Sequence, residues 1–258
     1  MEIIFLGTGG GRWVTITQKI NTGGFRIHAS KNMHIDPGPG ALVALQKANI
    51  SPLSTDAMLI SHCHPDHYTD AEVLIEAMTH GMTKQKGVLA CSESVLVGKD
   101  NLGPAISRYH QSKIRKLEIL KPGEESNIYD IKVEALPTRH SDSTTVGLKF
   151  HTECGILTYT SDTEYFEGIS KHYSGSRIMI LNAIRPKSDR IPWHLCVDDA
   201  IKIIREVKPE LAILNHFGMK MLGIANAEAR RAEKETGIRT ISAKDGARVA
   251  ISEGRIKC

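Results

Sequence analysis

A dense group of metal-binding side chains occupies residues 59–70, which read LISHCHPDHYTD. Three histidines and an aspartate follow an apolar run within six positions: His62, His64, Asp66 and His67. Alternate side chains of an extended backbone share a face, so His62 and His64 should point one way and Cys63 the other. Pro65 then turns the chain, and the next two residues can present a second ligand set. Imidazole and carboxylate without thiolate are typical of a catalytic zinc, iron or manganese site.

Three more metal-capable residues lie far along the chain, each at or just past the end of a predicted strand. They are His140, after the strand 131–137, Asp162, at the end of 155–162, and His216, at the end of 211–216. The carboxyl ends of strands are where α/β proteins gather their chemistry. A lone histidine at a strand end is usually structural, but three such residues favour a common site with the histidine-rich loop.

Short runs rich in β-branched residues, bounded by Gly, Pro, Asp or Asn, predict the strands that position these residues. The predicted strands are 2–7, 23–29, 56–61, 87–91, 131–137, 146–152, 155–162, 177–183, 211–216 and 247–252, and 146–152 with 155–162 should form a hairpin. The predicted helices are 39–50, 69–80, 197–209 and 226–237. Thr69 and Glu72 have the spacing of a capping box, which would anchor the metal loop.

This order of elements predicts an α/β fold in which one domain, residues 1–258, holds two sheets with helices outside. No low-complexity linker or fixed-period repeat divides the chain. The least regular stretch, 81–115, is rich in Lys and Arg. It is either a lid or substrate-binding insert, or a plain solvated connector.

Composition and cysteine spacing are those of an ordinary globular protein of the cytoplasm. The hydrophobic content of 41% and charged content of 24% are ordinary for a globular protein, and a net charge of +4 is too small to establish nucleic acid as the partner. Five widely spaced cysteines without a CxxC pair indicate reduced thiols and a cytoplasmic protein. The N-terminus reads as a strand and a glycine turn, and no segment approaches the ~18 apolar residues of a membrane span.

The chain resembles the metallo-β-lactamase superfamily. The resemblance rests on FLGTGG near the start, HIDPGPG at 34–40, the HxHxDH string, and the later His, Asp and His in order. It implies a four-layer αββα sandwich of two mixed β-sheets with helices on both outer faces. It also implies two divalent metal ions: one held by His62, His64 and His140, one by Asp66, His67 and His216, with Asp162 bridging both. Asp36 would support the loop.

The implied chemistry is hydrolysis, because two cations lower the pKa of water from ~15.7 toward neutrality. Asp66 would also orient the nucleophile. Zinc is favoured, with manganese or iron as alternatives. Redox chemistry is less favoured, since the diiron flavoproteins of this superfamily carry HxExD where this chain has His64. The cysteines do not occupy ligand positions, which argues against a catalytic thiol.

His194 is the residue that bears on the substrate. It precedes the helix with Asp198 and Asp199, and it resembles the histidine found before the last ligand strand in the phosphodiesterases and tRNA 3′-end endonucleases of the superfamily. There it contacts the scissile phosphate or aids the leaving group. The competing interpretation is a histidine making a local hydrogen bond. The endonucleases pair this histidine with an acidic residue and carry a protruding arm, and neither is convincing here.

The favoured substrate is therefore a cyclic nucleotide, a short oligonucleotide or another small phosphodiester. Arg139 and Arg185 lie near predicted site loops and could hold a phosphate, although each could equally be a surface residue. Trp13 and Trp193 could cover the pocket, although single aromatics more often serve packing. The alternative function is a carbonyl hydrolase of the lactonase, thioesterase or β-lactamase kind. A non-catalytic scaffold would tend to lose metal ligands, and the sequence leaves a homo-oligomer open.

Overall fold

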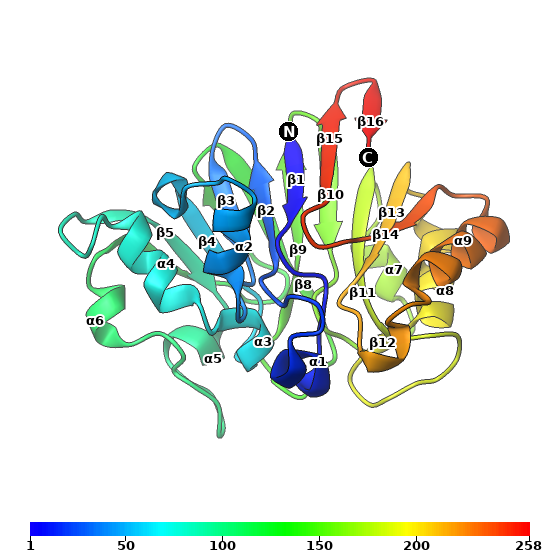
Figure 1. The fold of residues 1–258 in the computed structure, drawn as a ribbon, viewed down its shortest axis with the longest axis horizontal. Helices are drawn as coiled ribbons and strands as arrows, with labels where there is room; N and C mark the ends of the chain where they lie inside the picture. The colour runs from blue at the N-terminus through cyan, green and yellow to red at the C-terminus, as the bar shows by residue number, and fades with distance from the viewer.

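Two mixed β-sheets lie face to face, as Figure 1 shows for the computed structural model, which describes residues 1–258. In sheet order, the first contains β16 (Arg255–Lys257), β15 (Arg248–Ser252), β1 (Glu2–Phe5), β2 (Phe25–His28), β3 (Asn32–Ile35), β4 (Ala57–Ile60), β5 (Lys86–Cys91) and β6 (Ile114–Ile119). Its strands pair antiparallel from β16 to β3 and parallel from β3 to β6.

The second sheet mixes the two pairing modes in the same way. In sheet order it contains β14 (Thr240–Ser242), β13 (Leu211–Asn215), β11 (Ile178–Arg185), β10 (Gly155–Tyr159), β9 (Val146–Thr152), β8 (Ile131–Pro137) and β7 (Glu125–Ile128), with the short β12 (Leu195–Cys196) beside β11. Strands β10 to β14 pair parallel, and β7 to β10 pair antiparallel. The predicted hairpin is confirmed, since β9 and β10 pair through Thr152 and Gly155.

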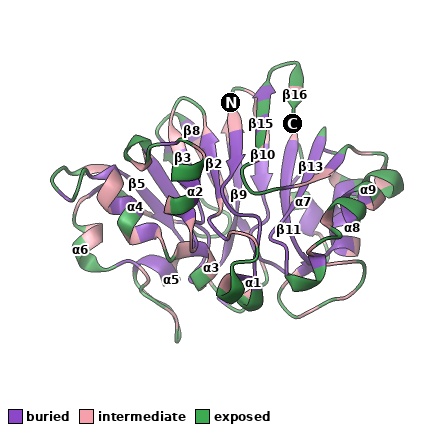
Figure 2. Cartoon of the chain, in the orientation of Figure 1, coloured by how far each residue is buried: buried purple, intermediate pink, exposed green.

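Helices cover both outer faces. On the first sheet lie α2 (Ala41–Lys47) and α4 (Ala71–Met78), and on the second lie α7 (Ile169–His172), α8 (Val197–Val207) and α9 (Ala225–Thr236). The remaining short helices are α1 (Arg12–Thr17), α3 (Pro65–Tyr68), α5 (Glu93–Leu96) and α6 (Arg108–Gln111), with 3-10 turns at Pro52–Ser54 and Met219–Met221. Figure 2 shows buried strands inside and helices with exposed outer faces. The expected four-layer α/β sandwich is confirmed.

Strand β4 shows why these residues form this fold. Ala57 and Leu59 face the core between the two sheets, whereas Met58 and Ile60 face the core under α2 and α4. Both faces are apolar because both are covered, as in a strand with parallel neighbours on each side. Such a continuous apolar run fixes the position of β4, and its carboxyl end delivers the histidine-rich loop to the edge of the sheet.

The capping box predicted at Thr69 is wrong. Residues Pro65–Tyr68 form a helical turn of their own, and the Thr69 hydroxyl bonds back to the Pro65 carbonyl. Helix α4 begins after Asp70, and Glu72 instead accepts the Ser107 backbone N–H at 2.7 Å. The metal loop is therefore anchored by its own turn, not by a cap on α4.

The stretch 81–115 contains more regular structure than its sequence suggests. It includes β5, α5, α6 and the start of β6, and Val95 and Ile106 are buried in the core under the first sheet. Figure 1 shows the loop between α5 and α6 extending beyond the edge where α1 and α3 lie. This loop is tied to the body where the Ser143 hydroxyl donates to Asp100 at 3.1 Å. No helix has the length and apolarity that a membrane crossing requires.

Candidate metal centre

His62, His64 and His140 bring three ring nitrogens to one point. The first two follow β4 and the third follows β8. His64 Nδ1 lies 3.0 Å from His62 Nε2 and 3.1 Å from His140 Nε2. Cys63, between the two loop histidines, points into the core under α4, as the alternation along the loop predicted. The three nitrogens thus form one face of a potential cation site.

Asp66, His67 and His216 form a second group beside the first. His67 Nε2 and His216 Nε2 lie 3.2 Å apart. Asp66 Oδ2 lies 3.4 Å from His216 Nε2 and 3.8 Å from His67 Nε2. Two imidazoles and a carboxylate from the loop after β4 and from the end of β13 therefore meet, although 149 residues separate the histidines.

Asp162 reaches both groups. Its Oδ2 lies 3.6 Å from His67 Nε2, and its Oδ1 lies 3.4 Å from His216 Nε2. Its carboxylate also lies within 4.8 Å of a ring nitrogen of His62 and of His140, members of the first group. Asn182 on β11 holds it by donating to Oδ1 at 2.8 Å. All seven side chains predicted as ligands thus lie in one cluster at the edge of the two sheets.

The histidine tautomers suit cation binding. Carbonyl and carboxylate oxygens accept only, so His140 donates from Nδ1 to the Trp193 carbonyl at 2.9 Å, and His67 donates from Nδ1 to Asp36 at 2.9 Å. Each ring can then offer Nε2 to a cation. Although burial alone would lower the pKa of His67, the carboxylates of Asp36, Asp162 and Asp66 raise it well above its usual range, so a cation binding there would replace a proton. Burial lowers the pKa of His62 well below its usual range and that of His140 to about 4, so both rings are neutral at physiological pH. The residues present fit divalent cations.

Asp36 orients histidines of both groups through hydrogen bonds. It accepts from the Ser61 backbone N–H at 2.7 Å, the Ser61 hydroxyl at 2.7 Å, the Tyr159 hydroxyl at 2.8 Å and His67 Nδ1. Because the Ser61 hydroxyl donates to Asp36, it accepts from His62 Nδ1 at 3.0 Å. One buried carboxylate therefore orients His67 directly and His62 through Ser61. This supporting role was predicted from the family resemblance.

Asp142 anchors the loop from the other side and was missed in the sequence. It accepts from the Cys63 backbone N–H at 2.9 Å, from the Ser94 hydroxyl, and from Thr144 N at 2.9 Å. Burial alone would raise the pKa of Asp142, but these hydrogen bonds lower it. The available signal was the string DST at 142–144, two residues after the predicted ligand His140, which is typical of an Asx turn.

We expect Asp142→Asn to lower the free energy of unfolding by about 1–3 kcal/mol, because an amide nitrogen would face a buried donor. Zinc affinity should fall with it, since the Cys63 N–H lies between His62 and His64. Urea unfolding and zinc titration measure the two effects. Asp100→Asn is the matched control, because Asp100 binds the same 141–144 loop from an exposed position. Equal effects of both variants would contradict the anchoring role.

His194 lies against the same cluster. Its Nδ1 donates to the Pro192 carbonyl at 2.9 Å, and its Nε2 lies 3.3 Å from Asp162 Oδ2. Burial alone would lower the pKa of His194, but the carboxylate of Asp162 raises it. The prediction that this histidine reaches the site therefore agrees with the geometry, and its ring packs edge-on against that of His140.

The two predicted phosphate-binding arginines make other contacts. Arg139 is exposed and places its guanidinium 4.9 Å from the centre of the Phe166 ring. Arg185 pairs with Asp189 at 3.2 Å. Neither makes an ion pair with a member of the cluster, so the structure does not bring these two side chains into it.

The glycine turn after β1 closes the second group. The Gly11 N–H donates to Asp66 Oδ2 at 2.8 Å. A Cβ on Gly10 would come within 2.1 Å of the His216 ring, so only glycine allows this backbone to approach so closely. The GTGGG segment is thus a tight turn that lines the site.

Two buried cysteines, Cys63 and Cys196, are inert. Burial raises the pKa of Cys63 to about 11, with the charge of Asp142 adding to the shift, and burial raises the pKa of Cys196 to about 11. A thiol with such a pKa carries almost no thiolate at neutral pH, so neither side chain is a nucleophile.

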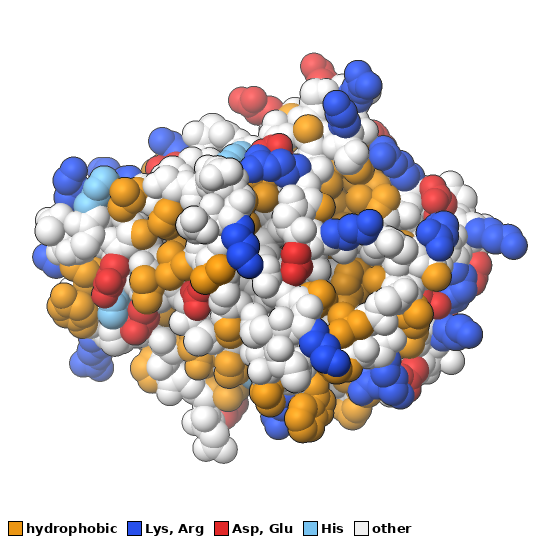
Figure 3. Space-filling view, viewed as in Figure 1, with side chains coloured by type: hydrophobic (Ala, Val, Ile, Leu, Met, Phe, Trp, Pro, Cys, Tyr) orange, Lys and Arg blue, Asp and Glu red, His pale blue; other side chains and the backbone are white.

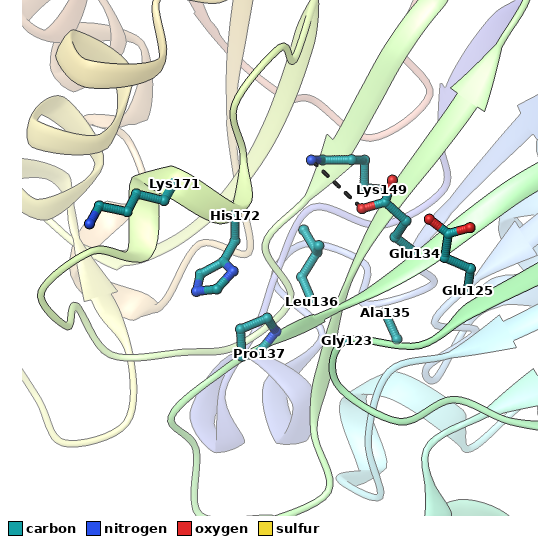
Figure 4. Close-up of a pocket in the computed structure, with 9 residues that line it drawn as sticks. All are labelled: Gly123, Glu125, Glu134, Ala135, Leu136, Pro137, Lys149, Lys171 and His172. Atoms are coloured by element: carbon teal, nitrogen blue, oxygen red, sulfur yellow. Dashed lines mark ion pairs between the residues drawn. The ribbon is translucent and has the colours of Figure 1, made fainter.

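A separate hollow of about 250 Å³ lies between strands β7 to β9 and helix α7 (Figure 4). Lys149 points across it and lies 3.9 Å from Glu134, and His172 faces it from α7. No member of the metal-capable cluster lines this hollow, and Lys149 there is paired with Glu134. It therefore has no part in the chemistry of the cluster.

The chain matches the family described as the β-lactamase superfamily domain over residues 31–217. The chain belongs to the metallo-β-lactamase superfamily. This is a family of hydrolases that bind divalent metal, and the His/Asp cluster is the part of the chain suited to that binding.

Relatives of this superfamily member include an uncharacterized protein of Methanocaldococcus jannaschii, 48% identical over 260 residues and covering 100% of this chain and 97% of that protein. Ribonuclease Z of Thermococcus kodakarensis is 32% identical over 79 residues, 30% of this chain and 24% of the enzyme. The chain therefore matches only about a quarter of that ribonuclease.

Solved structures agree on the fold. The metallo-β-lactamase fold protein YhfI of Bacillus subtilis has a TM-score of 0.79 at 17% identity, over 96% of this chain and 98% of that one. The short form of human tRNase Z scores 0.69 at 13% identity, over 98% and 100%. A diphosphatase from the PhnP family scores 0.66 at 16% identity, over 98% of each chain.

Proposed function

We propose that the chain is a dinuclear metal-dependent phosphodiesterase acting on a small phosphodiester or a short nucleic acid. One metal would be held by His62, His64 and His140, and the other by Asp66, His67 and His216, with Asp162 shared. Two bound cations, with zinc favoured and manganese or iron as alternatives, would supply an activated water and stabilise negative charge on phosphorus oxygens. Asp66 also receives the Gly11 N–H, which fixes its carboxylate for orienting the nucleophile.

The single observation that carries the phosphodiester assignment is the position of His194. Both its ring nitrogens face acceptors, the Pro192 carbonyl and Asp162, which favours the imidazolium. A cation at the rim of the cluster can bind an anionic phosphodiester and protonate a departing alkoxide. A neutral lactone or thioester would gain less binding energy from such a cation. Similarity to a ribonuclease Z, a tRNase Z fold and a diphosphatase supports phosphate chemistry.

We expect His194→Ala to lower kcat/KM for bis(p-nitrophenyl) phosphate by about 10²- to 10⁴-fold, the usual contribution of a general acid. Zinc content should stay at the wild-type value, because His194 is not among the proposed ligands. His151→Ala is the control, since His151 lies on the outer face of β9 and pairs with Glu134. Full activity of the His194 variant would remove the basis for the phosphodiesterase assignment.

The second candidate is a carbonyl hydrolase using the same metal centre. Its support is the pair of apolar residues Ile191 and Pro192, which line the cavity beside His194 and could contact an acyl group. Wild-type protein that hydrolyses lactones or thioesters faster than phosphodiesters would support this candidate.

Arg139, Arg185 and the loop between α5 and α6 belong to the proposal as substrate contacts. The loop would act as a lid, because it extends past the site edge and is tied by Asp100 to Ser143, three residues after His140. The arginines would need to leave Phe166 and Asp189 to reach a bound phosphate.

A further inference from the structure

The two tryptophans of this chain, Trp13 and Trp193, are both solvent-exposed. Trp13 has 70% of its surface exposed and Trp193 has 44%. Tryptophan is highly buried on average, because its ring contributes so much to a core. In a chain with only 5% aromatic residues, placing both of its largest rings in solvent is not explained by packing.

Trp13 is the second residue of α1, the helix that begins directly after Gly11. The Gly11 N–H donates to Asp66, a member of the second group of ligands, at 2.8 Å. Val14 is buried and holds the helix to the body, while Ile16, also 70% exposed, extends the apolar surface. Figure 3 shows hydrophobic side chains gathered at the lower edge of the molecule, over the position of α1 in Figure 1.

Trp193 lies next to the first group of ligands. Its backbone carbonyl accepts from His140 Nδ1 at 2.9 Å, and its backbone N–H donates to Glu164 at 3.3 Å. Its φ of 69° is unfavourable for a bulky residue and is therefore imposed by these surroundings. Its chain neighbours Pro192 and His194 line a cavity of about 420 Å³, within the usual range for ligand sites, together with residues that include Glu164 and Arg190.

We propose that Trp13 and Trp193 are stacking surfaces for nucleobases, one on each side of the scissile phosphodiester. This inference rests on the proposed function and makes its substrate class narrower. Every nucleobase has a π-face, so exposed aromatic rings bind single-stranded nucleic acid with little sequence preference. Glu164 and the half-exposed guanidinium of Arg190 line this cavity and can bond to the edges of a base, which an acyl chain could not use. Two surfaces flanking two groups of ligands favour a dinucleotide or longer strand over a cyclic mononucleotide.

The two rings also provide the means to test the proposal, because all tryptophan fluorescence comes from them. Zinc-loaded wild type, Trp13→Phe and Trp193→Phe would be excited at the red edge of tryptophan absorption and titrated with a phosphorothioate tetrathymidylate. An abasic tetramer with the same backbone is the control for charge alone. We expect the thymidylate to quench all three proteins and the abasic tetramer to quench none.

Two results would overturn the proposal. One is equal quenching by the abasic tetramer, and the other is no quenching in either single-tryptophan variant while the protein hydrolyses bis(p-nitrophenyl) phosphate. If the protein hydrolyses bis(p-nitrophenyl) phosphate in either case, the phosphodiesterase assignment stands. If the thymidylate quenches the fluorescence but the protein hydrolyses no phosphodiester, the stacking surfaces stand and the proposed activity fails.

Kinetics give a second readout. We expect Trp13→Ala or Trp193→Ala to raise KM for an oligothymidylate by roughly 5- to 150-fold, the range for losing one stacked base. The matching Phe variants should recover most of this loss, which a merely structural role for indole would not require. Tyr109→Ala, at a 62% exposed aromatic residue on α6, should leave KM unchanged. An Ala variant with the KM of Tyr109→Ala would contradict the stacking role.

Discussion

Replacing Asp162 by asparagine should abolish most of the proposed activity and reduce zinc content from the proposed two ions per chain to at most one. Asn182 would keep the amide oxygen in the place of Oδ1. The amide nitrogen would then stand where Oδ2 faces His67 and His194. Although burial raises the pKa of Asp162, His216 and His67 lower it well below the usual range, so the variant loses a full negative charge. We expect kcat/KM to fall by at least about 1,000-fold, more than the roughly 10- to 100-fold for outer-shell partners.

Metal analysis of the dialysed protein and hydrolysis of bis(p-nitrophenyl) phosphate measure this effect. Asp130→Asn is the matched control, because Asp130 is exposed and bonds only to Ser30. A variant at Asp162 that keeps two zinc ions and more than about a tenth of wild-type activity would have lost no more than an outer-shell partner costs. That result would show that this carboxylate is not shared between the two metals.

Asp36→Asn should have the second-largest effect, although Asp36 is not a proposed ligand. Its φ of 51° is tolerated by asparagine, so the backbone should persist. The amide nitrogen in place of Oδ2 would face His67 Nδ1, which now donates to Asp36. His67 would respond by moving its proton to Nε2, the nitrogen that faces His216. We expect zinc affinity to fall by about 10- to 100-fold at the second group.

Competitive zinc titration against a chelator measures this loss, and urea unfolding of the metal-free protein measures its structural cost. The free energy of unfolding should fall by about 1–3 kcal/mol, because buried donors of Ser61 and Tyr159 lose an acceptor. Asp56→Asn is a suitable control, because Asp56 caps the start of β4 through Asn32 at the opposite end of the strand. Unchanged zinc affinity in the Asp36 variant would contradict its orienting role.

The seven cluster residues could be predicted because their positions follow from local rules. Alternation places His62 and His64 together, and Asp162 and His216 follow strands that end at one edge of the fold. Their mutual distances could not be predicted, because they depend on two sheets packing against each other through residues such as Leu59 and Leu148. The resemblance to a known family supplied that arrangement.

Two of the strands that sequence patterns missed are polar edge strands. Strand β6 reads IRKLEI and lies at a sheet edge, where charged residues face solvent, and β7 reads ESNI at the other sheet's edge. The capping box at Thr69 failed because proline starts a separate helical turn in the metal loop. Asp142 was missed because its partners, Cys63 and Ser94, are distant in sequence.

The exposure of Trp13 and Trp193 is likewise a tertiary property. In the sequence both rings are compatible with a core position, and only the folded chain places them in solvent beside the cluster. This difference between the sequence interpretation and the structure is what points to the stacking surfaces.

The central claim, that two metals on this cluster drive phosphodiester hydrolysis, is tested most directly by titrating chelator-treated protein with zinc. The measured quantity is the rate of bis(p-nitrophenyl) phosphate hydrolysis at each zinc-to-protein ratio. The expected result is no activity without metal and a plateau reached at about two zinc ions per chain, as two groups of ligands require. Hydrolysis that persists in the metal-free protein, or a plateau at one zinc ion per chain, would contradict the claim.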